Sequence, residues 1–246
     1  VLIVGANGFI GSILFNSLKK SSKFYVTGLC RSHSNTRSSL GDDGLKYVDY
    51  QKLSNRDFRD FDIVINVAGL AHTNLPSGPA SERLYKSVNV DLTASIAKMS
   101  AKAGVKRFIY LSSVKVNGSH TSINNPFTQS SPPNPLSDYA RSKYEAELRL
   151  WDIEKKSKME IVIIRPPLVY GPGVKANLYL LQKLVKVPFI VPLGGLLSNK
   201  RSMVSVVNLI DFIKCCMIHP NAANHTLLIS DDDDVSTSKL VSLLKD

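Results

Sequence analysis

The chain has 246 residues, of which 43% are hydrophobic and 21% charged, a composition typical of a globular protein with a full core. No apolar run reaches the roughly 18 residues that a membrane-spanning helix requires, which argues against a membrane protein. The formal net charge of +11 favours an anionic partner. Because the basic residues are spread along the chain rather than clustered, a phosphorylated small molecule fits this charge better than nucleic acid does.

The cysteines and histidines favour neither a disulfide framework nor a metal site. Cys30, Cys215 and Cys216 include no C-x-x-C spacing, which is typical of a reducing compartment, so we expect a cytoplasmic protein. The five histidines are scattered, and the run from Asp231 to Asp234 is interpreted as a solvated turn, so we expect no metal. The chain begins without Met, directly in an apolar run, and we expect that its natural N-terminus is missing.

The first strand is predicted at residues 1–4, and a glycine-rich turn and a helical pattern follow it. Glycines in this context let the backbone approach a pyrophosphate, which binds at the N-terminus of the helix. The turn lacks the Lys-Ser/Thr ending of a Walker loop. A tight turn without a ligand is the alternative, but the strand on one side and the helix on the other favour dinucleotide binding. The expected contacts are Gly5, Gly8, Phe9, Ile10 and Gly11.

The second strand, predicted at residues 24–30, ends where such folds select their cofactor. An acidic residue at this point would bind the ribose 2′-OH of NAD, whereas an arginine accommodates the 2′-phosphate of NADP. Arg31 stands there and therefore favours NADP over NAD, with a solvated loop arginine as the alternative. After a loop at residues 32–44, a short third strand at 45–50 brings Asp49 to the adenine edge of the cofactor.

The next two strands supply further candidate residues at their C-terminal ends. The buried strand at residues 62–69 ends in Val67, Ala68 and Gly69, whose small size would let a cofactor lie against the backbone. A helical stretch from about residue 82 to 103 contains Asn89, which by itself is most simply a satisfied polar residue. The fifth strand, at 105–111, is followed by Ser113, where ligands of open parallel sheets bind.

A pair of residues at helical spacing, Tyr139 and Lys143, follows a proline-rich loop at residues 124–138. Residues at i and i+4 are neighbours on a helix, and an ammonium beside a phenol favours the phenolate. Such a pair is a device for general acid/base catalysis, although packing and solubility would also explain it. We expect Ser137 to cap this helix and Tyr139 and Lys143 to flank its buried stripe, which consists of Ala140, Tyr144, Leu148 and Trp151.

Beyond a sixth strand at residues 160–165 the regular alternation of strands and helices breaks. The pattern predicts a helix near 177–187, a strand at 203–207, a helix, a strand at 226–229 and a last helix from 236. We assign residues 1–173 to a Rossmann domain of the α/β class, with a doubly wound parallel sheet. Residues 174–246 are predicted to form a smaller substrate-binding part that is interleaved with the sheet.

A series of motifs spans almost the whole chain: Gly5-x-x-Gly8-x-x-Gly11, Asn66-Val-Ala-Gly69, Asn89, Leu111-Ser-Ser113, Tyr139-x-x-x-Lys143, Arg165-Pro-x-x-Val-Tyr-Gly-Pro172 and Arg201-Ser-Met-Val-x-Val. In this order and spacing the chain resembles the extended short-chain dehydrogenase/reductase family, which comprises nucleotide-sugar epimerases and dehydratases.

The resemblance implies a role for each matching residue. Tyr139 would transfer a proton, Lys143 would lower its pKa and hold the nicotinamide ribose, and Ser113 would orient the sugar oxygen. Asn177 and Arg201 match positions that hold the diphosphate of a UDP-sugar, for which the planar fork of an arginine is suited. Further contacts are expected from Pro166 and Leu168 to the cofactor and from Lys115 to the substrate.

Departures from the family pattern narrow the activity. Sugar dehydratases carry Thr-Asp-Glu where this chain has Ser113-Val114-Lys115, which disfavours dehydration. The segment Val116-Asn117-Gly118 lacks a tyrosine that the family often has, and Ser202 replaces an aspartate. The chain resembles a bacterial subgroup of UDP-glucose 4-epimerases and reductases that form UDP-N-acetylquinovosamine. Because members of this subgroup are longer, we expect that a C-terminal part is absent, and the family suggests a homodimer.

We therefore expect hydride transfer between an NAD or NADP nicotinamide and C4 of a UDP-hexose. Two reactions stay open: a 4-epimerase that retains NAD, which is the commonest activity of the subgroup, and an NADPH-dependent reductase of a 4-keto-6-deoxy sugar, which Arg31 favours. A cofactor-sensing or RNA-binding protein without enzyme activity is a third alternative. The presence of Tyr139, Lys143 and Ser113 disfavours it.

Overall fold

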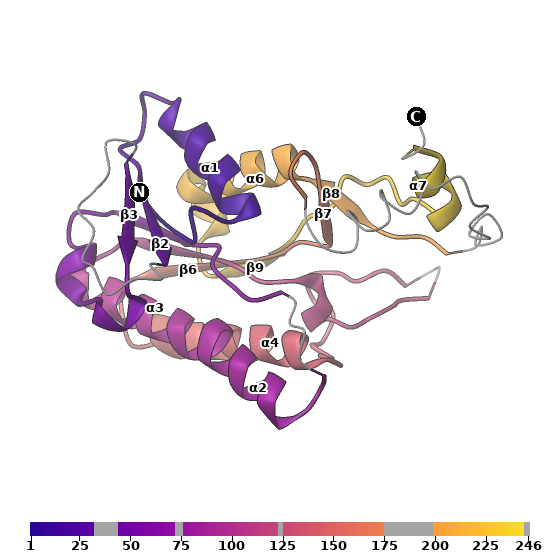
Figure 1. Ribbon diagram of the computed structural model, residues 1–246, viewed down its shortest axis with the longest axis horizontal. Helices are drawn as coiled ribbons and strands as arrows, with labels where there is room; N and C mark the ends of the chain where they lie inside the picture. The colour runs from indigo at the N-terminus through magenta and orange to yellow at the C-terminus, as the bar shows by residue number, and fades with distance from the viewer. Residues whose placement is uncertain (32–43, 72–75, 123–124, 175–198, 244–246) are drawn as a thin grey trace.

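A computed structural model describes residues 1–31, 44–71, 76–122, 125–174 and 199–243. Within these ranges, seven parallel strands form one sheet in the order β3-β2-β1-β4-β5-β6-β9 (Figure 1). The strands are β1 (Leu2–Val4), β2 (Thr27–Arg31), β3 (Leu45–Val48), β4 (Ile63–Asn66), β5 (Arg107–Leu111), β6 (Glu160–Arg165) and β9 (His225–Leu228). The predicted α/β class with a doubly wound parallel sheet is confirmed, and the strand order reverses between β1 and β4, where such sheets bind ligands.

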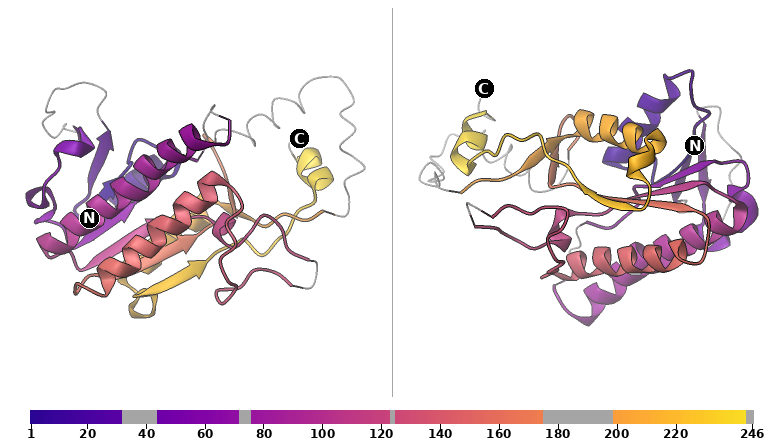
Figure 2. Two further views of the ribbon diagram at one scale, coloured as in Figure 1. Left: turned by 90° about the horizontal axis from the view of Figure 1, so that it is seen from below. Right: turned by 180° about the vertical axis from the view of Figure 1, so that it is seen from behind.

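Helices cover both faces of the sheet, which therefore lies between two apolar cores (Figures 1 and 2). On one face lie α1 (Phe9–Lys19) and α6 (Val206–Ile218), and on the other lie α2 (Pro79–Tyr85), α3 (Leu92–Ala103) and α4 (Asp138–Glu154). Strand β5 shows why both faces are covered, because Ile109 belongs to the core beneath α1 and α6, whereas Phe108 and Tyr110 belong to the other. Strands buried on both faces need a continuous apolar run.

Most predicted elements are present, and several of their ends differ. Strand β2 begins at Thr27 rather than at residue 24, and β3 ends at Val48, so that Asp49 begins a 3₁₀ turn. The helical stretch predicted from about residue 82 begins at Pro79 and is interrupted by a π-helical segment, Lys86–Asp91, between α2 and α3. This segment contains Asn89. Such π-helical turns occur frequently at functional sites.

The buried face of α4 differs from the predicted stripe. Leu148 is 46% exposed, and Tyr144 and Trp151 are partly exposed. Ala140 is buried as predicted, and the helix also buries Lys143, Glu147 and Leu150, together with Asp138, Ser142, Ala146 and Ile153. The prediction was wrong for the other three residues because it counted only apolar side chains, whereas α4 buries charged groups that have polar partners. Lys143 consequently lies within the buried face and not at its flank.

The C-terminal residues contribute to the main sheet and to a second, smaller one. Strand β9 forms the edge next to β6, and β7 (Leu168–Tyr170) pairs with β8 (Met203–Ser205). A last helix, α7 (Thr237–Leu243), follows. The helix predicted at 177–187 lies outside the described residues, and the division into parts at residue 173 stays a prediction.

No described helix is long and apolar enough to cross a membrane. Among the described residues, no group of three or more His, Cys, Asp or Glu side chains is arranged to hold a metal ion.

Candidate active site

The glycine turn between β1 and α1 brings backbone segments into close contact. Gly5 has a φ of 86°, and a Cβ atom at this position would lie 2.8 Å from the backbone of Ala68, which follows β4. A Cβ at Gly11 would lie 2.1 Å from the carbonyl oxygen of Gly5. Side chains are therefore excluded where the ends of β1 and β4 meet the start of α1. Gly8 is the N-cap of α1 and offers no side-chain hydrogen bond, so the first turn with Phe9 and Ile10 fits the pyrophosphate of a dinucleotide.

The ends of β2 and β3 carry the two residues expected to read the adenosine part of a cofactor. Arg31 is the exposed last residue of β2, and residues 32–43 that follow it lie outside the described part. Asp49 follows β3, and its Oδ1 accepts a hydrogen bond from the backbone N–H of Gln51 at 3.0 Å. Both residues are at the edge of the sheet where they were expected, and Asp49 also caps a 3₁₀ turn.

Asn89 connects the loop after β4 to α4. Its side chain is fully buried, its Oδ1 accepts from the backbone N–H of Leu70 at 2.8 Å, and its Nδ2 donates to the carbonyl of Leu70 at 3.0 Å. Nδ2 also donates to the Ser142 hydroxyl at 2.9 Å, and that hydroxyl donates to the Tyr139 carbonyl at 2.8 Å. Asn89 therefore holds the loop after β4 and the first turn of α4 in one arrangement.

Lys143 is buried beside this loop. Its Nζ donates to the carbonyl of Leu111 at 2.6 Å and lies over the ring of Tyr110, 4.2 Å from the ring centre. A Cβ at Gly69 would lie 3.6 Å from the same Nζ. Burial lowers the pKa of Lys143 to about 7, and the nearby charge of Glu147 opposes this shift. The ammonium therefore lies between the end of β5 and the loop after β4.

The pKa of Tyr139 is raised in this chain, because burial disfavours the phenolate. An interaction with the Ser113 hydroxyl works in the opposite direction, and Tyr85, whose ring is packed against that of Tyr139, raises the pKa further. The sequence had led us to expect a pKa lowered by Lys143. The reason for the difference is that Lys143 directs its ammonium to the Leu111 carbonyl, so that burial dominates at the phenol.

Ser113 stands at the C-terminal end of β5, as expected. It is buried, and its hydroxyl accepts a hydrogen bond from the backbone N–H of Lys115 at 3.2 Å, which begins a 3₁₀ turn. The segment is held from the next strand, since the N–H of Val114 donates to the Pro166 carbonyl at 3.0 Å. Lys115 itself is exposed.

A buried charged network beneath this site was not predicted. Arg165 donates from Nε to Glu147 Oε1 at 3.0 Å and from Nη2 to Glu147 Oε2 at 2.5 Å, and from Nη1 to Asn117 Oδ1 at 3.1 Å. The Ser112 hydroxyl donates to Glu147 Oε1 at 2.5 Å. The sequence signal for this network is the position of Glu147, four residues after Lys143 on the same helix face.

The remaining predicted residues are more scattered. Pro166 is buried, Leu168 is the exposed first residue of β7, and Asn177 lies outside the described residues. Arg201 is exposed, and its backbone pairs with that of Val235 at 2.9 and 3.2 Å. The described contacts thus bring together Gly69, Asn89, Ser113, Tyr139 and Lys143, whereas Arg31, Asp49, Lys115 and Arg201 lie outside this cluster.

Comparison with known proteins gives matches along nearly the whole chain. The model of the NAD-dependent epimerase/dehydratase family matches residues 1–229. A UDP-glucose 4-epimerase of Vibrio cholerae is 41% identical over 245 residues, which are 98% of this chain and 73% of that protein. An N-acetyl-alpha-D-glucosaminyl-diphospho-ditrans,octacis-undecaprenol 4-epimerase of Escherichia coli O157:H7 is 29% identical over 248 residues, with 98% of this chain and 70% of that protein covered.

Solved structures share the fold at lower identity. The UDP-glucuronic acid 4-epimerase of Bacillus cereus, solved in complex with UDP-glucuronic acid and NAD, has a TM-score of 0.83 and 22% identity, with 99% of this chain and 81% of that chain covered. At this identity the likeness concerns the fold.

Proposed function

Because this chain belongs to the NAD-dependent epimerase/dehydratase family and is thus an enzyme, we propose that it is a UDP-sugar 4-epimerase of the UDP-glucose type. The observation that carries the proposal is the convergence of Ser113, Tyr139 and Lys143 beside the glycine turn and the loop after β4. The relative at 41% identity, named a UDP-glucose 4-epimerase, supports the choice of reaction.

The residues present fit a dinucleotide. The first turn of α1 after Gly5 and Gly8 would hold the pyrophosphate, while Gly69 and Lys143 would hold the nicotinamide ribose. Gly5 and Gly11 keep the end of β1, the loop after β4 and the start of α1 in close contact, because a Cβ at either position would fall within 3 Å of neighbouring backbone atoms. When bound, NAD supplies the redox chemistry by accepting a hydride from a sugar carbon and returning it.

Tyr139 handles the proton that belongs to the sugar hydroxyl. Its raised pKa keeps the phenol protonated near neutral pH, so that it is ready to donate to a sugar oxygen. Removing a proton from the sugar requires the phenolate, which nearby positive charge stabilises, and Lys143, one turn further along the same helix, is the proposed cation. Ser113 interacts with the phenol and orients the same sugar oxygen.

A second candidate function rests on Arg31. Its exposed position at the end of β2 suits the 2′-phosphate of NADP, and a cofactor that is exchanged after each turnover suits a reductase. The substrate of such an enzyme would be a UDP-4-keto-6-deoxy-hexosamine, and the product UDP-N-acetylquinovosamine.

Nucleotide content and turnover measurements test these proposals. The nucleotide that co-purifies with the protein should be NAD, and UDP-glucose should be converted into UDP-galactose without added cofactor. Tyr139→Phe should retain the nucleotide but lose turnover by about 10²–10⁴-fold. Tyr144→Phe, a partly exposed tyrosine of the same helix, is the matched control and should keep its activity. An active Tyr139→Phe variant would contradict the assignment, and NADPH consumption with a 4-keto sugar would favour the reductase.

A further inference from the structure

Helix α2 buries two residues, Ser81 and Tyr85, and both contact the start of α4. They lie four residues apart and therefore on one face of α2. The Ser81 hydroxyl donates to Asp138 Oδ2, and the Tyr85 ring packs against the Tyr139 ring with centroids 6.0 Å apart and planes at 57°. The buried face of α2 thus contacts two consecutive residues, one of which is the proposed proton carrier.

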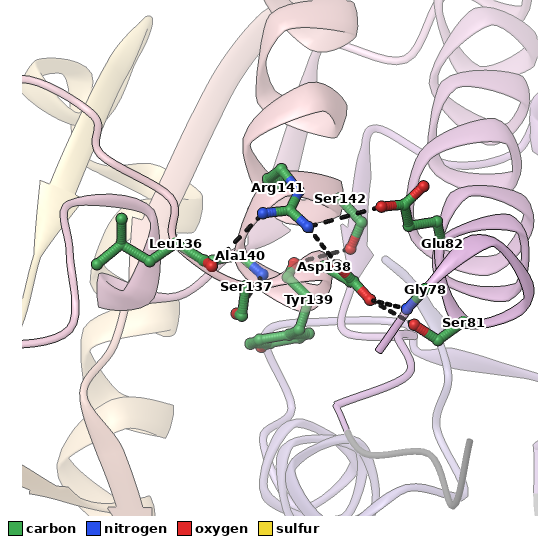
Figure 3. Close-up of polar contacts among 10 residues, drawn as sticks. All are labelled: Gly78, Ser81, Glu82, Leu136, Ser137, Asp138, Tyr139, Ala140, Arg141 and Ser142. Atoms are coloured by element: carbon green, nitrogen blue, oxygen red, sulfur yellow. Dashed lines mark hydrogen bonds and ion pairs between the residues drawn. The ribbon is translucent and has the colours of Figure 1, made fainter. Parts of the chain in front are cut away.

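The carboxylate of Asp138 is the junction between the two helices (Figure 3). It is 8% exposed, and its Oδ2 also accepts from the backbone N–H of Gly78 at 3.4 Å. Its Oδ1 accepts from Arg141, which extends toward Glu82 of α2 with a separation of 3.7 Å. The hydroxyl of Ser81 is the main group that lowers the pKa of Asp138, so the carboxylate is ionised at neutral pH.

Asp138 is not needed as the cap of α4. That role belongs to Ser137, whose hydroxyl accepts from the backbone N–H of Ala140 at 3.2 Å. The Arg141–Glu82 ion pair has both side chains about half exposed and contributes little stability. The buried contacts of Asp138 therefore serve mainly to fix α4 sideways against α2, at the residue that precedes Tyr139.

We propose that the buried face of α2 positions the Tyr139 phenol: Ser81 fixes Asp138 and hence the first turn of α4, and Tyr85 sets the orientation of the Tyr139 ring. Both are positioning residues that act through their neighbours. The inference rests on the proposed function, because it takes Tyr139 as the group that transfers the proton. Displacing a reacting group by about 1 Å costs up to about 10²-fold in rate.

The ring contact is tested with two substitutions at one position. Tyr85→Leu removes the ring and should lower kcat by about tenfold or more while KM changes by less than about threefold, because orientation and not substrate binding is lost. Tyr85→Phe keeps the ring and should recover most of kcat. Equal kcat values for wild type and Tyr85→Leu would overturn the role of the ring, as would an equal loss in both variants.

The Ser81–Asp138 contact is tested by a double-mutant cycle. Ser81→Ala and Asp138→Asn should each lower kcat, and the double variant should lose about as much as the worse single variant, because both changes remove one interaction. Glu82→Gln, next to Ser81 and exposed, is the control and should keep its kcat. Losses of kcat that multiply in the double variant would show that Ser81 does not act through Asp138.

A readout without substrate separates this inference from the proposed function. The ¹³C resonance of the Tyr139 ring, assigned by comparison with Tyr139→Phe in the nucleotide-bound protein, gives the pKa of the phenol. Burial raises the pKa of the Tyr139 phenol in the wild type. In Tyr85→Leu this pKa should fall, because water gains access to the phenol. If the Tyr139 pKa falls in Tyr85→Leu but the wild type does not turn over any UDP-sugar, the proposed function is contradicted and the positioning role stands. An unchanged pKa with full turnover would overturn the positioning role, and if Tyr85→Leu does not fold, Ser81→Ala against Glu82→Gln decides.

Discussion

Lys143 is a buried charged residue whose ammonium donates to a carbonyl oxygen and lies over an aromatic face. Neither neighbour replaces the hydration that the ammonium loses, so burial lowers its pKa to about 7. Lys143 therefore changes its protonation near neutral pH, one helical turn from Tyr139.

This shift predicts how stability depends on pH. In the unfolded chain Lys143 has an ordinary pKa near 10.5, so between about pH 7 and pH 10.5 the unfolded state binds more protons than the folded state. Stability therefore rises with pH across this window. Below it Lys143 is protonated in both states, and the folded state carries the full free-energy cost of burying the ammonium. Relative to Lys143→Met, the wild-type free energy of unfolding should increase by at most about 1.4 kcal/mol per pH unit there.

Urea unfolding of the nucleotide-free protein at pH 6.5, 8 and 9.5 measures this difference, with Lys98→Met as an exposed control for the loss of a charge. Parallel pH curves for wild type and Lys143→Met would contradict the buried ammonium.

The Glu147–Arg165 pair predicts a second effect at single residues. Both side chains are almost fully buried, and removing one leaves the other charge without compensation. Glu147→Met should destabilise the protein by about 3–5 kcal/mol, and Glu147→Met combined with Arg165→Met should lose clearly less than the sum of the two single changes. In the same helix, Glu145 and Arg149 form an exposed pair, so Glu145→Met should cost about 0.5 kcal/mol or less. Urea unfolding measures all four variants, and similar losses for Glu147→Met and Glu145→Met would contradict the prediction.

At the scale of elements, α4 combines packing with chemistry along one face. Tyr139, Lys143 and Glu147 follow one another at spacings of four, and Leu150 and Ile153 continue the buried face toward the C-terminus. The first half of the helix therefore contacts the site and the second half contacts the core beneath β5 and β6. The two halves explain how a helix with few apolar residues in its first turns stays anchored.

The close contact between the turn after β1 and the start of α1 predicts that a methyl group added at Gly11 disturbs both nucleotide binding and stability. In Gly11→Ala the Cβ would lie 2.1 Å from the Gly5 carbonyl oxygen, so α1 must move away from the turn. We expect loss of co-purifying nucleotide together with a lower Tm. Ser12→Ala, which removes a hydroxyl that donates to the Phe9 carbonyl at 3.2 Å, is the control. Nucleotide content after denaturation and a thermal melt measure both, and wild-type values for Gly11→Ala would refute the close contact.

At the scale of the whole molecule, elements after residue 200 pack in the same core and the same sheet as the N-terminal elements. Helix α6 packs in the same core as α1, with Leu209 and Ile213 buried beside Leu14 and Ile109. Arg107 of β5 donates to the carbonyls of Cys216 at 2.7 Å and His219 at 3.0 Å, which holds the end of α6 to the sheet. The cytoplasmic location and the homodimer stay predictions.

This packing predicts that residues 1–173 alone do not fold cooperatively. Without α6 and β9 the fragment would expose the apolar surface that α6 covers beside α1 and the open edge of β6, and such surfaces cause aggregation. Residues 1–229, which include both elements, should retain a cooperative thermal transition. Near-UV circular dichroism and dye binding compare the two fragments with the full chain. A cooperative transition in the fragment 1–173 would show that the C-terminal elements are dispensable for folding.

Local signals in the sequence predicted the strands, the glycine turn and the Ser137 cap. Apolar runs of four to six residues and glycine spacing depend on neighbouring residues alone, and so do capping residues. Ser113 follows β5, and Asn89 and Lys143 join it because they bond to Leu70 after β4 and to Leu111 at the end of β5, which lie at one edge of the parallel sheet. The strand ends were less well predicted, since pairing partners and turns decide them.

The sequence by itself determined the fold class, the family and the identity of the catalytic candidates. Only the tertiary structure decided the buried face of α4, the raised pKa of Tyr139 and the contact of α2 with Asp138 and Tyr139. The physical reason is that burial and proton affinity depend on groups distant in sequence: Ser81 and Asp138 are 57 residues apart, and the Leu111 carbonyl that holds Lys143 is 32 residues away. Sequence spacing places Tyr139 beside Lys143, and the surrounding fold decides which group each of them contacts.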